Sequence, residues 1–405
     1  MTSSTYADHF SIHNLPYGIA SSPSHPTPQC ATRLNNTVIF LSDLQSAGLF
    51  SSIPSLPDNI FSNTTLNPFA SLPRDTQTQV RHVLQSIFQT STSTSSLPES
   101  STADITTVTM HLPVSIPAFT DYSASLPHNQ HAGQIILNHP APPPAFFHFP
   151  IGYAGRASTI SVSGTPVTRP SGHFYDRTDP SFPQTKKVIF GPSRALDYEL
   201  ELGIIIGNPV PRGQGLKAQD AEEHIFGLVI LNDWSGPLNG KNFATTISPW
   251  IVTLDALQPF KTSGPEPRVS LPPHLQDPGH FCYDISVVTE LEASTEKGAS
   301  SSTVLARGNA KDLFWSIRQM CAHLASTGCD LRTGDILGTG TVSGEEEGSY
   351  GCLLEVTEGG KKKVKLMDGE ERGYLVDGDV VRLTAWAGEG VGFGECVGQI
   401  LPARD

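Results

Sequence analysis

Basic residues are scarce in this sequence. Its 405 residues include 26 Lys and Arg against 39 Asp and Glu, which gives a formal net charge of −13, and the first lysine is Lys186. Nucleic acids and anionic membranes are bound through positive electrostatic fields, so this balance excludes both as expected partners. The ligand that complements such a chain is a cation.

Cysteine and long apolar runs are also few. The six cysteines form no C-x-x-C pair and no zinc spacing with histidine, so we interpret them as reduced, buried thiols and expect a cytoplasmic protein. No apolar run approaches the roughly 18 residues that cross a bilayer. The first residues, M-T-S-S-T-Y-A-D-H-F, lack the charged and apolar regions of a signal peptide. The sequence therefore predicts a soluble chain that does not enter a membrane.

Glycine and proline are abundant, with 36 and 33 residues. This loop-rich composition predicts a mainly β fold of the α+β class, built from many short strands. We expect a first unit at residues 1–110 and a second at 111–405. In the first unit, Thr76–Phe88 has apolar residues at helical spacing and is predicted to be a helix. The Ser/Thr-rich tract at 89–104 is predicted to be a linker or loose loop.

Strand-length segments rich in β-branched residues dominate the sequence from about residue 105 onward. They are Thr107–Leu112, Val188–Gly191, Leu202–Ile206, Gly227–Asn232, Trp250–Leu254, Tyr283–Leu291, Gly351–Val356 and Val380–Ala385. One helix is predicted among them, at Lys311–Leu324, because its apolar residues recur at helical spacing and Gly328 follows as a stop signal. We interpret those apolar residues, and His323 near the helix end, as packing residues.

An acidic strand organises the functional prediction. In L-D-Y-E-L-E-L-G, alternation puts Asp197, Glu199 and Glu201 on one face of a strand and apolar residues on the other. The competing interpretation is an edge strand with a solvated acidic side. The apolar continuation at 204–206 favours a sheet interior, where carboxylates must be paired or bound to a metal. This face is therefore a candidate metal site.

Two further segments could carry chemistry, each with a simple structural alternative. His131 lies in a Pro/Ser/Asn-rich segment after Asp121, which we predict to be a loop; it could serve as a general base, or be an ordinary surface histidine. Tyr153 lies between Gly152 and Gly155, a spacing that suits a tight turn presenting the tyrosine but is a weak signal.

Two more segments follow later in the chain. Asp233 ends an apolar strand and could ligate a hard cation, while Lys241 could act as a proton donor or an electrostatic clamp; a surface turn with a solvated ion pair is the alternative. Thr341 lies in a Gly/Thr-rich turn that could admit a ligand or could be a plain hairpin. Glu355 lies in a predicted apolar strand and would need a partner if buried, for which His131 is a candidate.

Taken together, these segments resemble the fumarylacetoacetase family over nearly the whole chain. The matching motifs are N-L-P-Y-G at 14–18, T-M-H-L-P at 109–113, Q-H-A at 130–132, G-Y-A-G-R-A-S at 152–158, S-G-T-P at 163–166, L-D-Y-E-L-E at 196–201, H-I-F-G at 224–227, N-D-W-S at 232–235, T-T-I-S-P-W at 245–250, the Gly/Thr turn at 338–344, L-V-D-G-D at 375–379 and V-G-F-G-E-C at 391–396. The resemblance implies an N-terminal SH3-like barrel followed by a β-sandwich roll, in a homodimer.

The resemblance also implies an activity and a set of site residues. The activity is metal-dependent hydrolysis of a carbon–carbon bond in a 1,3-diketo acid, most directly fumarylacetoacetate to fumarate and acetoacetate, in tyrosine and phenylalanine breakdown. The implied ligands of Mg²⁺ or Ca²⁺ are Asp121, Glu199, Glu201 and Asp233, with Lys241 and Thr245 beside the ion. His131 would activate water, Glu355 would orient His131, Lys241 would help protonate the leaving group, and Tyr153 and Thr341 would contact substrate. Asp197 drops out of the ligand set.

The sequence departs from this family at the site itself. About a dozen family residues are absent between Ser235 and the G-P-L-N-G-K segment that ends at Lys241, including an oxyanion-stabilising Arg and Gln. After His131, a turn whose Arg holds the substrate carboxylate is replaced by Ile136-Leu137-Asn138-His139-Pro140, and a substrate-contacting Tyr is replaced by Ser123. Three explanations stay open. The chain is a hydrolase, decarboxylase or tautomerase for another oxo acid, a catalytically impaired metal-binding paralogue, or the product of a gene prediction with an omitted segment.

Overall fold

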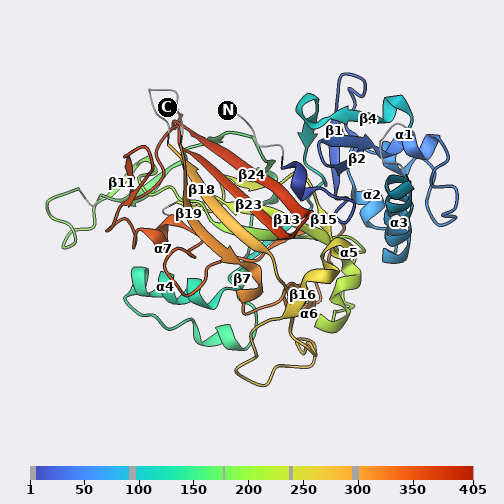
Figure 1. Cartoon of the computed structure of the whole chain (residues 1–405). Helices are drawn as coiled ribbons and strands as arrows, with labels where there is room; N and C mark the ends of the chain where they lie inside the picture. Colours follow the sequence, from blue (N-terminus) through green and yellow to red (C-terminus); the bar gives the residue numbers. More distant parts are fainter. Residues whose placement is uncertain (1–5, 91–96, 177, 237–239, 294–300, 405) are drawn as a thin grey trace.

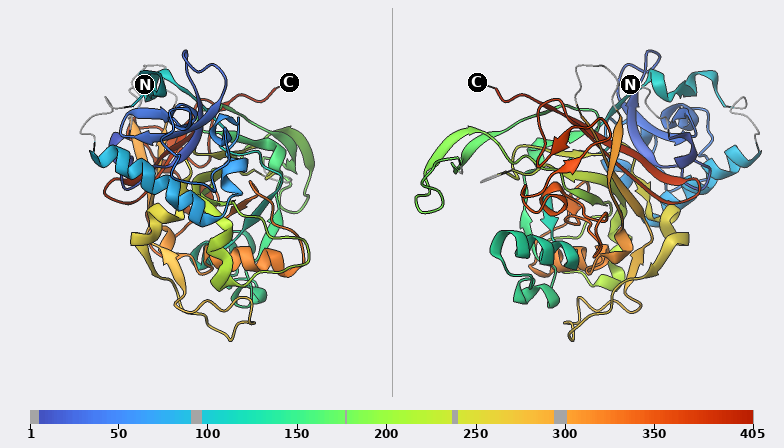
Figure 2. Two further views of the ribbon diagram at one scale, coloured as in Figure 1. Left: turned by 90° about the vertical axis from the view of Figure 1, so that its right-hand side faces the viewer. Right: turned by 60° about the vertical axis from the view of Figure 1, so that its left-hand side comes forward.

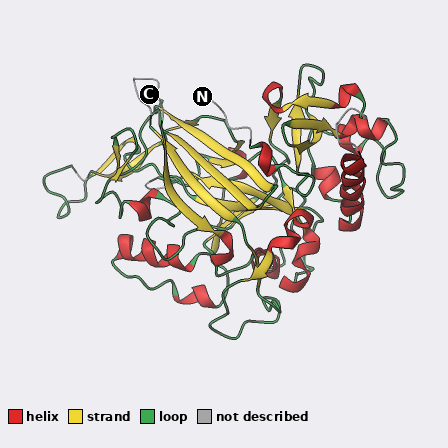
Figure 3. Cartoon of the chain, viewed as in Figure 1, coloured by secondary structure: helices red, strands yellow, loops and turns green. Residues whose placement is uncertain are grey.

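The structure is a computed structural model that describes residues 6–90, 97–176, 178–236, 240–293 and 301–404. Its fold is a mixture of sheets and short helices, as Figure 3 shows, in agreement with the predicted α+β class. The smaller, N-terminal part is built on a five-stranded antiparallel sheet in the order β4-β3-β2-β1-β5 (Figure 1). Its strands are β1 (Tyr17–Ser21), β2 (Gln29–Leu34), β3 (Thr37–Phe40), β4 (Thr102–Asp104) and β5 (Thr109–His111).

Three α-helices accompany this sheet, α1 (Leu41–Ser46), α2 (Asn67–Ala70) and α3 (Arg74–Thr90). The predicted helix at Thr76–Phe88 is confirmed, because it lies inside α3. The predicted linker at 89–104 is wrong at its C-terminal end, since β4 pairs there with β3 and completes the sheet. Residues 91–96 of that tract lie outside the described residues.

The larger part contains two sheets that pack against each other. The first has eight strands in the order β7-β6-β20-β12-β13-β14-β8, with β15 also paired to β13. Its strands are β6 (Phe119–Tyr122), β7 (Gly152–Ala154), β8 (Ile160–Val162), β12 (Leu200–Ile206), β13 (Ile225–Asp233), β14 (Thr245–Ile247), β15 (Val252–Thr253) and β20 (Ile336–Gly338).

The second sheet has five strands in the order β19-β18-β23-β24-β9 and crosses in front of β13 and β15 in Figure 1. Its strands are β9 (Val167–Thr168), β18 (Ser286–Glu292), β19 (Ser302–Asn309), β23 (Val380–Gly388) and β24 (Val391–Leu401). Three strand pairs stand apart from both sheets: β10 (Ser171–Tyr175) with β11 (Val188–Pro192), β16 (Lys261–Ser263) with β17 (Phe281–Tyr283), and β21 (Val364–Lys365) with β22 (Glu371–Arg372). The β10–β11 hairpin projects from the body of the protein (Figure 2).

Short helices border the two large sheets. The α-helices are α4 (Leu126–Leu137), α5 (Leu254–Leu257), α6 (Ile317–Ser326) and α7 (Leu353–Val356). The 3₁₀-helices among the described residues are η1 (Ala7–His9), η2 (Ile60–Ser62), η4 (Glu99–Ser101), η5 (Ile105–Thr107), η6 (Pro144–Phe147), η7 (Ala157–Thr159), η8 (Ala218–His224), η9 (Gln258–Phe260) and η10 (Ala310–Asp312). Within the described ranges, no helix combines the length and the apolar character needed to cross a membrane.

Most strand predictions are confirmed, and three other predictions are wrong in informative ways. The segment around His131 is not a loop, because it forms α4, capped by the Ser125 side chain. Gly351–Val356 is not a strand, because residues 353–356 form α7. The helix predicted at Lys311–Leu324 begins only at Ile317, where a capping box between Ser316 and Gln319 starts it.

Strands β12 and β13 are buried on both faces, which explains their nearly continuous apolar sequences. Along β12, Ile204 packs into the core between the two large sheets, and Ile205 packs into the core shared with the N-terminal part. Leu228 and Val229 alternate in the same way along β13. The same alternation of side chains along the strand predicted an acidic face, and it places Glu201 on the same face of the sheet as Ile205. The eight-stranded sheet is therefore the central layer of the molecule.

Candidate active site

Three buried carboxylates from three strands meet at one end of the eight-stranded sheet. Asp121 on β6, Glu201 on β12 and Asp233 at the end of β13 are 2%, 0% and 0% exposed. One oxygen of each lies within 4.8 Å of the others. They share the sheet face that, further along the strands, packs against the N-terminal part. The apolar side chains on that face end where the carboxylates begin.

Gly338 on β20 makes this convergence possible, because β20 lies between β6 and β12. A Cβ at Gly338 would lie 2.7 Å from Asp121 Oδ1 and 2.7 Å from Glu201 Oε2. Two residues later, Gly340 has a φ of +74° and its backbone N–H donates to Glu201 Oε2 at 3.1 Å. The Gly/Thr-rich turn predicted from the sequence therefore leaves space for the carboxylates and orients one of them.

Lys241 links this cluster to Glu199. Its Nζ lies 2.6 Å from Asp233 Oδ2 and 2.6 Å from Glu199 Oε2. Thr245 donates to Asp233 Oδ1 at 2.9 Å, and Tyr153 donates to Asp233 Oδ2 at 3.0 Å. Every residue implied as a ligand or ligand neighbour is thus in one contact network.

The network has more negative charge than its protein partners neutralise. Burial and then the neighbouring Asp233 raise the pKa of Asp121 to about 7, and burial raises the pKa of Glu201 well above its usual value. Burial lowers the pKa of Lys241, but Glu199 and Asp233 outweigh it and hold this pKa well above its usual value.

Two buried oxygens of this network, Asp121 Oδ1 and Glu201 Oε1, have no hydrogen-bond donor in the part of the chain that the structure describes. Buried carboxylate oxygens without a donor are costly unless a cation contacts them. An all-oxygen donor set is the one that hard divalent cations prefer. The residues present therefore suit a bound divalent cation.

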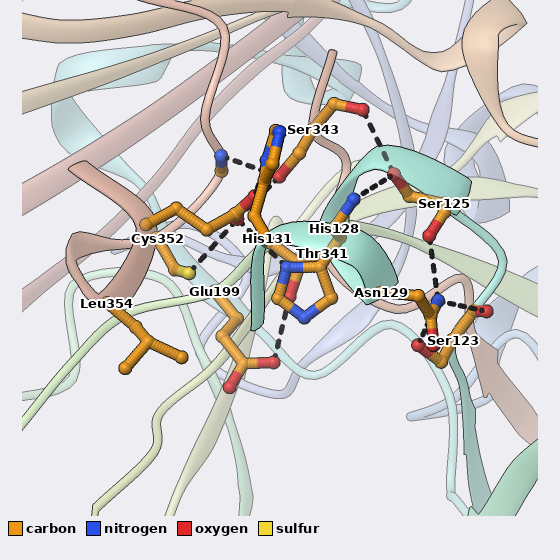
Figure 4. A network of polar contacts seen from close by, with 12 residues as sticks. Ser123, Ser125, His128, Asn129, His131, Glu199, Thr341, Ser343, Cys352 and Leu354 are labelled. Atoms are coloured by element: carbon orange, nitrogen blue, oxygen red, sulfur yellow. Dashed lines mark hydrogen bonds and ion pairs between the residues drawn. The ribbon is translucent and has the colours of Figure 1, made fainter. Parts of the chain in front are cut away.

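A second group beside the carboxylates is built on Glu355, which is 2% exposed. His128 Nδ1 donates to its Oε2 at 2.8 Å, and His131 Nδ1 donates to its Oε1 at 2.8 Å. Ser343 also donates to Oε2, at 2.7 Å. In Figure 4 the ring of His128 extends toward Glu199 and Thr341, whereas His131 lies on the side of Ser343.

Asp197 explains how Glu355 is positioned. Its Oδ1 accepts the backbone N–H of Leu353 at 2.8 Å and its Oδ2 accepts that of Leu354 at 2.7 Å. These are the first residues of α7, so the carboxylate satisfies two of the donors that a helix start leaves free. Burial raises the pKa of Asp197 to about 7. Asp197, which precedes β12, is thus a structural support for the segment that contains Glu355.

A cavity of about 450 Å³ connects the two groups. Residues from both line it: Asp121, His128, Tyr153, Glu199, Lys241, Thr341, Cys352, Leu354 and Tyr374. Lys241 is the only Lys or Arg among the described residues of the wall. Residues 237–239 of the shortened segment before it lie outside the described residues.

His128 is the site residue that the sequence reasoning missed. It lines the cavity, whereas His131 does not. Burial lowers the pKa of His128, but Glu355 outweighs burial and raises it above its usual value. The available signal was the i, i+3 spacing of His128 and His131, which places both on one face of a helix. That signal was lost because a loop was predicted here.

Comparison with known proteins agrees with this geometry. Residues 13–113 match the family described as "Fumarylacetoacetase N-terminal", and residues 118–401 match "Fumarylacetoacetate (FAA) hydrolase C-terminal". Fumarylacetoacetase of Aspergillus fumigatus is 42% identical over 97% of this chain and 96% of that protein. The Arabidopsis thaliana enzyme is 38% identical over 98% and 96%, and the human enzyme 34% identical over 97% and 96%.

Solved structures share the fold at lower identity. Fumarylacetoacetate hydrolase of Exiguobacterium antarcticum has a TM-score of 0.52 at 17% identity, covering 96% of this chain and 100% of that one. Maleylpyruvate hydrolase of Sphingobium sp. SYK-6, in complex with manganese(II) ion and pyruvate, gives the same TM-score, identity and coverage. Because two family regions together span most of the sequence and relatives above 30% identity cover nearly all of it, the chain belongs to the fumarylacetoacetase family.

Proposed function

We propose that this chain hydrolyses fumarylacetoacetate to fumarate and acetoacetate, a carbon–carbon bond cleavage in tyrosine and phenylalanine catabolism. Its curated relatives have the name of this activity. The observation that carries the proposal is that His128, the hydrogen-bond partner of Glu355, lines the same cavity as the carboxylates Asp121 and Glu199. Water activation and carbonyl polarisation are therefore available to the same bound molecule.

Mg²⁺ or Ca²⁺ is the proposed cation, held by Asp121, Glu199, Glu201 and Asp233. When bound, it would polarise the ketone oxygens of a 1,3-diketone as a Lewis acid. Thr245 and Tyr153 hold Asp233 through both of its oxygens, which fixes the orientation of that carboxylate. The two oxygens without donors support this role for Asp121 and Glu201.

We assign the water-activating base to His128 in place of the predicted His131. The Nδ1–H of His128 donates to Glu355, so its Nε2 is left as the proton acceptor. The carboxylate stabilises the imidazolium that forms when the water proton arrives. Attack of the resulting hydroxide on a ketone carbon and breakage of the adjacent C–C bond yield one carboxylate product and one carbanion, which takes up a proton.

Lys241 is the proposed donor of positive charge near that carbanion. Its ammonium group lies in the wall of the cavity and contacts two carboxylates, so it can stabilise the developing enolate and supply a proton to it. Thr341 donates to Glu199 Oε2 at 3.0 Å. We propose that Thr341 and Tyr153, which both line the cavity, also contact the substrate.

One observation favours a second substrate class. Among the described residues that line the cavity there is no Arg to pair with a substrate carboxylate. Ile136, which follows the two histidines on α4 and is 65% exposed, also lines the cavity. A diketone or oxo acid with an apolar end in that position is the alternative substrate. Decarboxylation or tautomerisation of an oxo acid would also need the cation and not the lost segment.

Matched histidine variants test the proposed function. Purified protein with Mg²⁺ or Ca²⁺ should consume fumarylacetoacetate, measured by loss of diketone enol absorbance and by detection of both products. His128→Gln should lower kcat by at least about 10²-fold, the typical contribution of a general base, whereas His131→Gln should lower it far less. Equal losses would contradict the assignment of the base, and no turnover in the unmodified protein would contradict the function.

Three structural features belong to the same proposal. We propose that residues 1–110 form an SH3-like barrel and that residues 111–405 form the catalytic unit, a β-sandwich roll. The five-stranded antiparallel sheet and the two packed sheets support this division. We also propose a homodimer, which light scattering would test.

A further inference from the structure

A second potential metal-binding group lies beside the oxygen cluster, and its chemistry is different. One ligand atom each of His128, Cys352 and Glu355 lies within 4.8 Å of the other two. His128 Nδ1 is 2.8 Å and Cys352 Sγ is 3.2 Å from the same oxygen, Glu355 Oε2. The set combines an imidazole, a thiol and a carboxylate, which together suit Zn²⁺ and related thiophilic cations.

We propose that His128, Cys352 and Glu355 bind Zn²⁺ or a similar thiophilic cation, and that this binding blocks hydrolysis. The proposal that these residues bind the cation depends only on their ligand atoms. The blocking half rests on the proposed function, because it assumes that His128 is the base. An ion on His128 and Glu355 would break the hydrogen bond that orients the imidazole.

Two of the three ligand-atom pairs require only a small expansion, and the third pair, between His128 and Cys352, lies within 4.8 Å. Bonds from Zn²⁺ to N, O and S of about 2.0–2.3 Å in a tetrahedron place neighbouring ligand atoms about 3.3–3.6 Å apart. The present separations of 2.8 and 3.2 Å are the hydrogen-bonded ones. An increase of a few tenths of an ångström in these two separations would therefore replace the hydrogen bonds by metal–ligand bonds. Solvent would supply the fourth ligand, since His128 and Cys352 both line the cavity.

The charges balance when the ion enters. In the metal-free protein Cys352 is a thiol, because burial and the nearby Glu355 raise its pKa well above the usual value. A bound dication reverses this preference and releases the thiol proton to solvent. The resulting thiolate and the Glu355 carboxylate neutralise Zn²⁺. His128 coordinates through Nδ1 as the neutral imidazole, and the proton that Nδ1 donated to Glu355 moves through solvent to Nε2. His131 and Ser343 keep their own hydrogen bonds to Glu355, which hold that carboxylate in place.

The two metal-binding groups should prefer different cations, because their ligand atoms differ in softness. Asp121, Glu201 and Asp233 offer only oxygen and favour Mg²⁺ or Ca²⁺, whereas the thiolate favours Zn²⁺, Cd²⁺ or Co²⁺. Saturating Mg²⁺ should therefore fill the first group and leave the second to a thiophilic ion. Cobalt is a useful probe because cobalt bound to a thiolate has a charge-transfer absorption that oxygen ligands do not give.

The experiment is a Co²⁺ titration of the full chain with Mg²⁺ in excess. We expect a thiolate charge-transfer band that saturates at one equivalent. Cys352→Ser should abolish the band, and His128→Gln should weaken Co²⁺ binding more than about tenfold. Cys282→Ser is the matched control, because Cys282 is equally a buried free thiol but its S–H donates to the backbone carbonyl of Leu313 and not to a carboxylate. This variant should keep the band. Thermal unfolding of each variant checks that it is folded.

The outcomes separate the two halves of the proposal. Absence of the band in the unmodified protein, or its persistence in Cys352→Ser, would overturn the site. Zn²⁺ should inhibit Mg²⁺-supported turnover of the unmodified protein more strongly than that of Cys352→Ser; a saturated band without inhibition would overturn the blocking role. A protein that shows the band but never hydrolyses the diketone would refute the proposed function and leave the site intact.

Discussion

Replacement of Gly338 by alanine tests whether the carboxylates form a cation site. The new Cβ would lie 2.7 Å from oxygens of both Asp121 and Glu201, whereas ordinary contacts begin at 3.4 Å. Each oxygen must then move by 3.4 − 2.7 = 0.7 Å, which exceeds the roughly 0.2 Å tolerance of metal–ligand distances. We expect cation affinity to fall by about 10- to 100-fold, as when groups that support metal ligands are altered.

The measurement is the gain in thermal stability that Mg²⁺ or Ca²⁺ gives over the chelated protein. At a cation concentration of 100 times Kd this gain is about 2.7 kcal/mol, and a 100-fold weaker site reduces it to about 0.4 kcal/mol. Chelated Gly338→Ala should itself be less stable by about 1–3 kcal/mol from overpacking. Gly191→Ala is the control, because nothing lies within 4 Å of its added Cβ. An undiminished gain in Gly338→Ala would refute the cation site.

Three further predictions concern the base, its support and the central sheet. A base must be unprotonated, and Glu355 raises the pKa of His128. We therefore expect kcat/KM to fall as the pH drops through a midpoint above about 6.5. In Glu355→Gln, burial lowers the pKa of His128, so the midpoint of the pH–rate profile should move below about 6.5. Asp197→Ala leaves the N–H groups of Leu353 and Leu354 without their acceptor; unfolding should show a loss of about 1–3 kcal/mol, and steady-state kinetics a larger effect on kcat than on KM. Ile205→Ala should cost about 2–5 kcal/mol in denaturant unfolding, because the side chain is 0% exposed in a second core; a cost near zero would contradict two-sided burial.

The sequence was sufficient to predict the acidic face because that prediction needs only local periodicity. The alternation of Leu200, Glu201 and Leu202 appears directly in the chain, and the structure places the two leucines in one core. The apolar residues of α3 were equally readable, since one helical face recurs every three to four residues.

The failures arose where a distant residue decides the local structure. Glu355 lies in an apolar segment that could be a strand, but Asp197, far away in the sequence, caps it as a helix. The predicted pairing of His131 with Glu355 is present, whereas the contact of His128 with the same carboxylate was missed because α4 was not predicted. The contact of Asp197 with α7 has no local signature, because side chains that meet through tertiary packing leave no periodic pattern in the sequence.

The burial of β12 and β13 on both faces has a consequence for how the site is specified. A one-residue slip of a strand exchanges its two faces. Because β12 has apolar residues on both faces, such as Ile204 and Ile205, burial of apolar side chains alone discriminates weakly between the two registers. The polar ends discriminate strongly, since a slip of β12 would carry Glu201 into the core between the sheets, where an unpaired carboxylate costs several kcal/mol. Gly203 adds a steric constraint, because a Cβ there would lie 2.9 Å from Val229 Cγ2. The carboxylates that form the candidate cation site therefore also select the strand register on which that site depends.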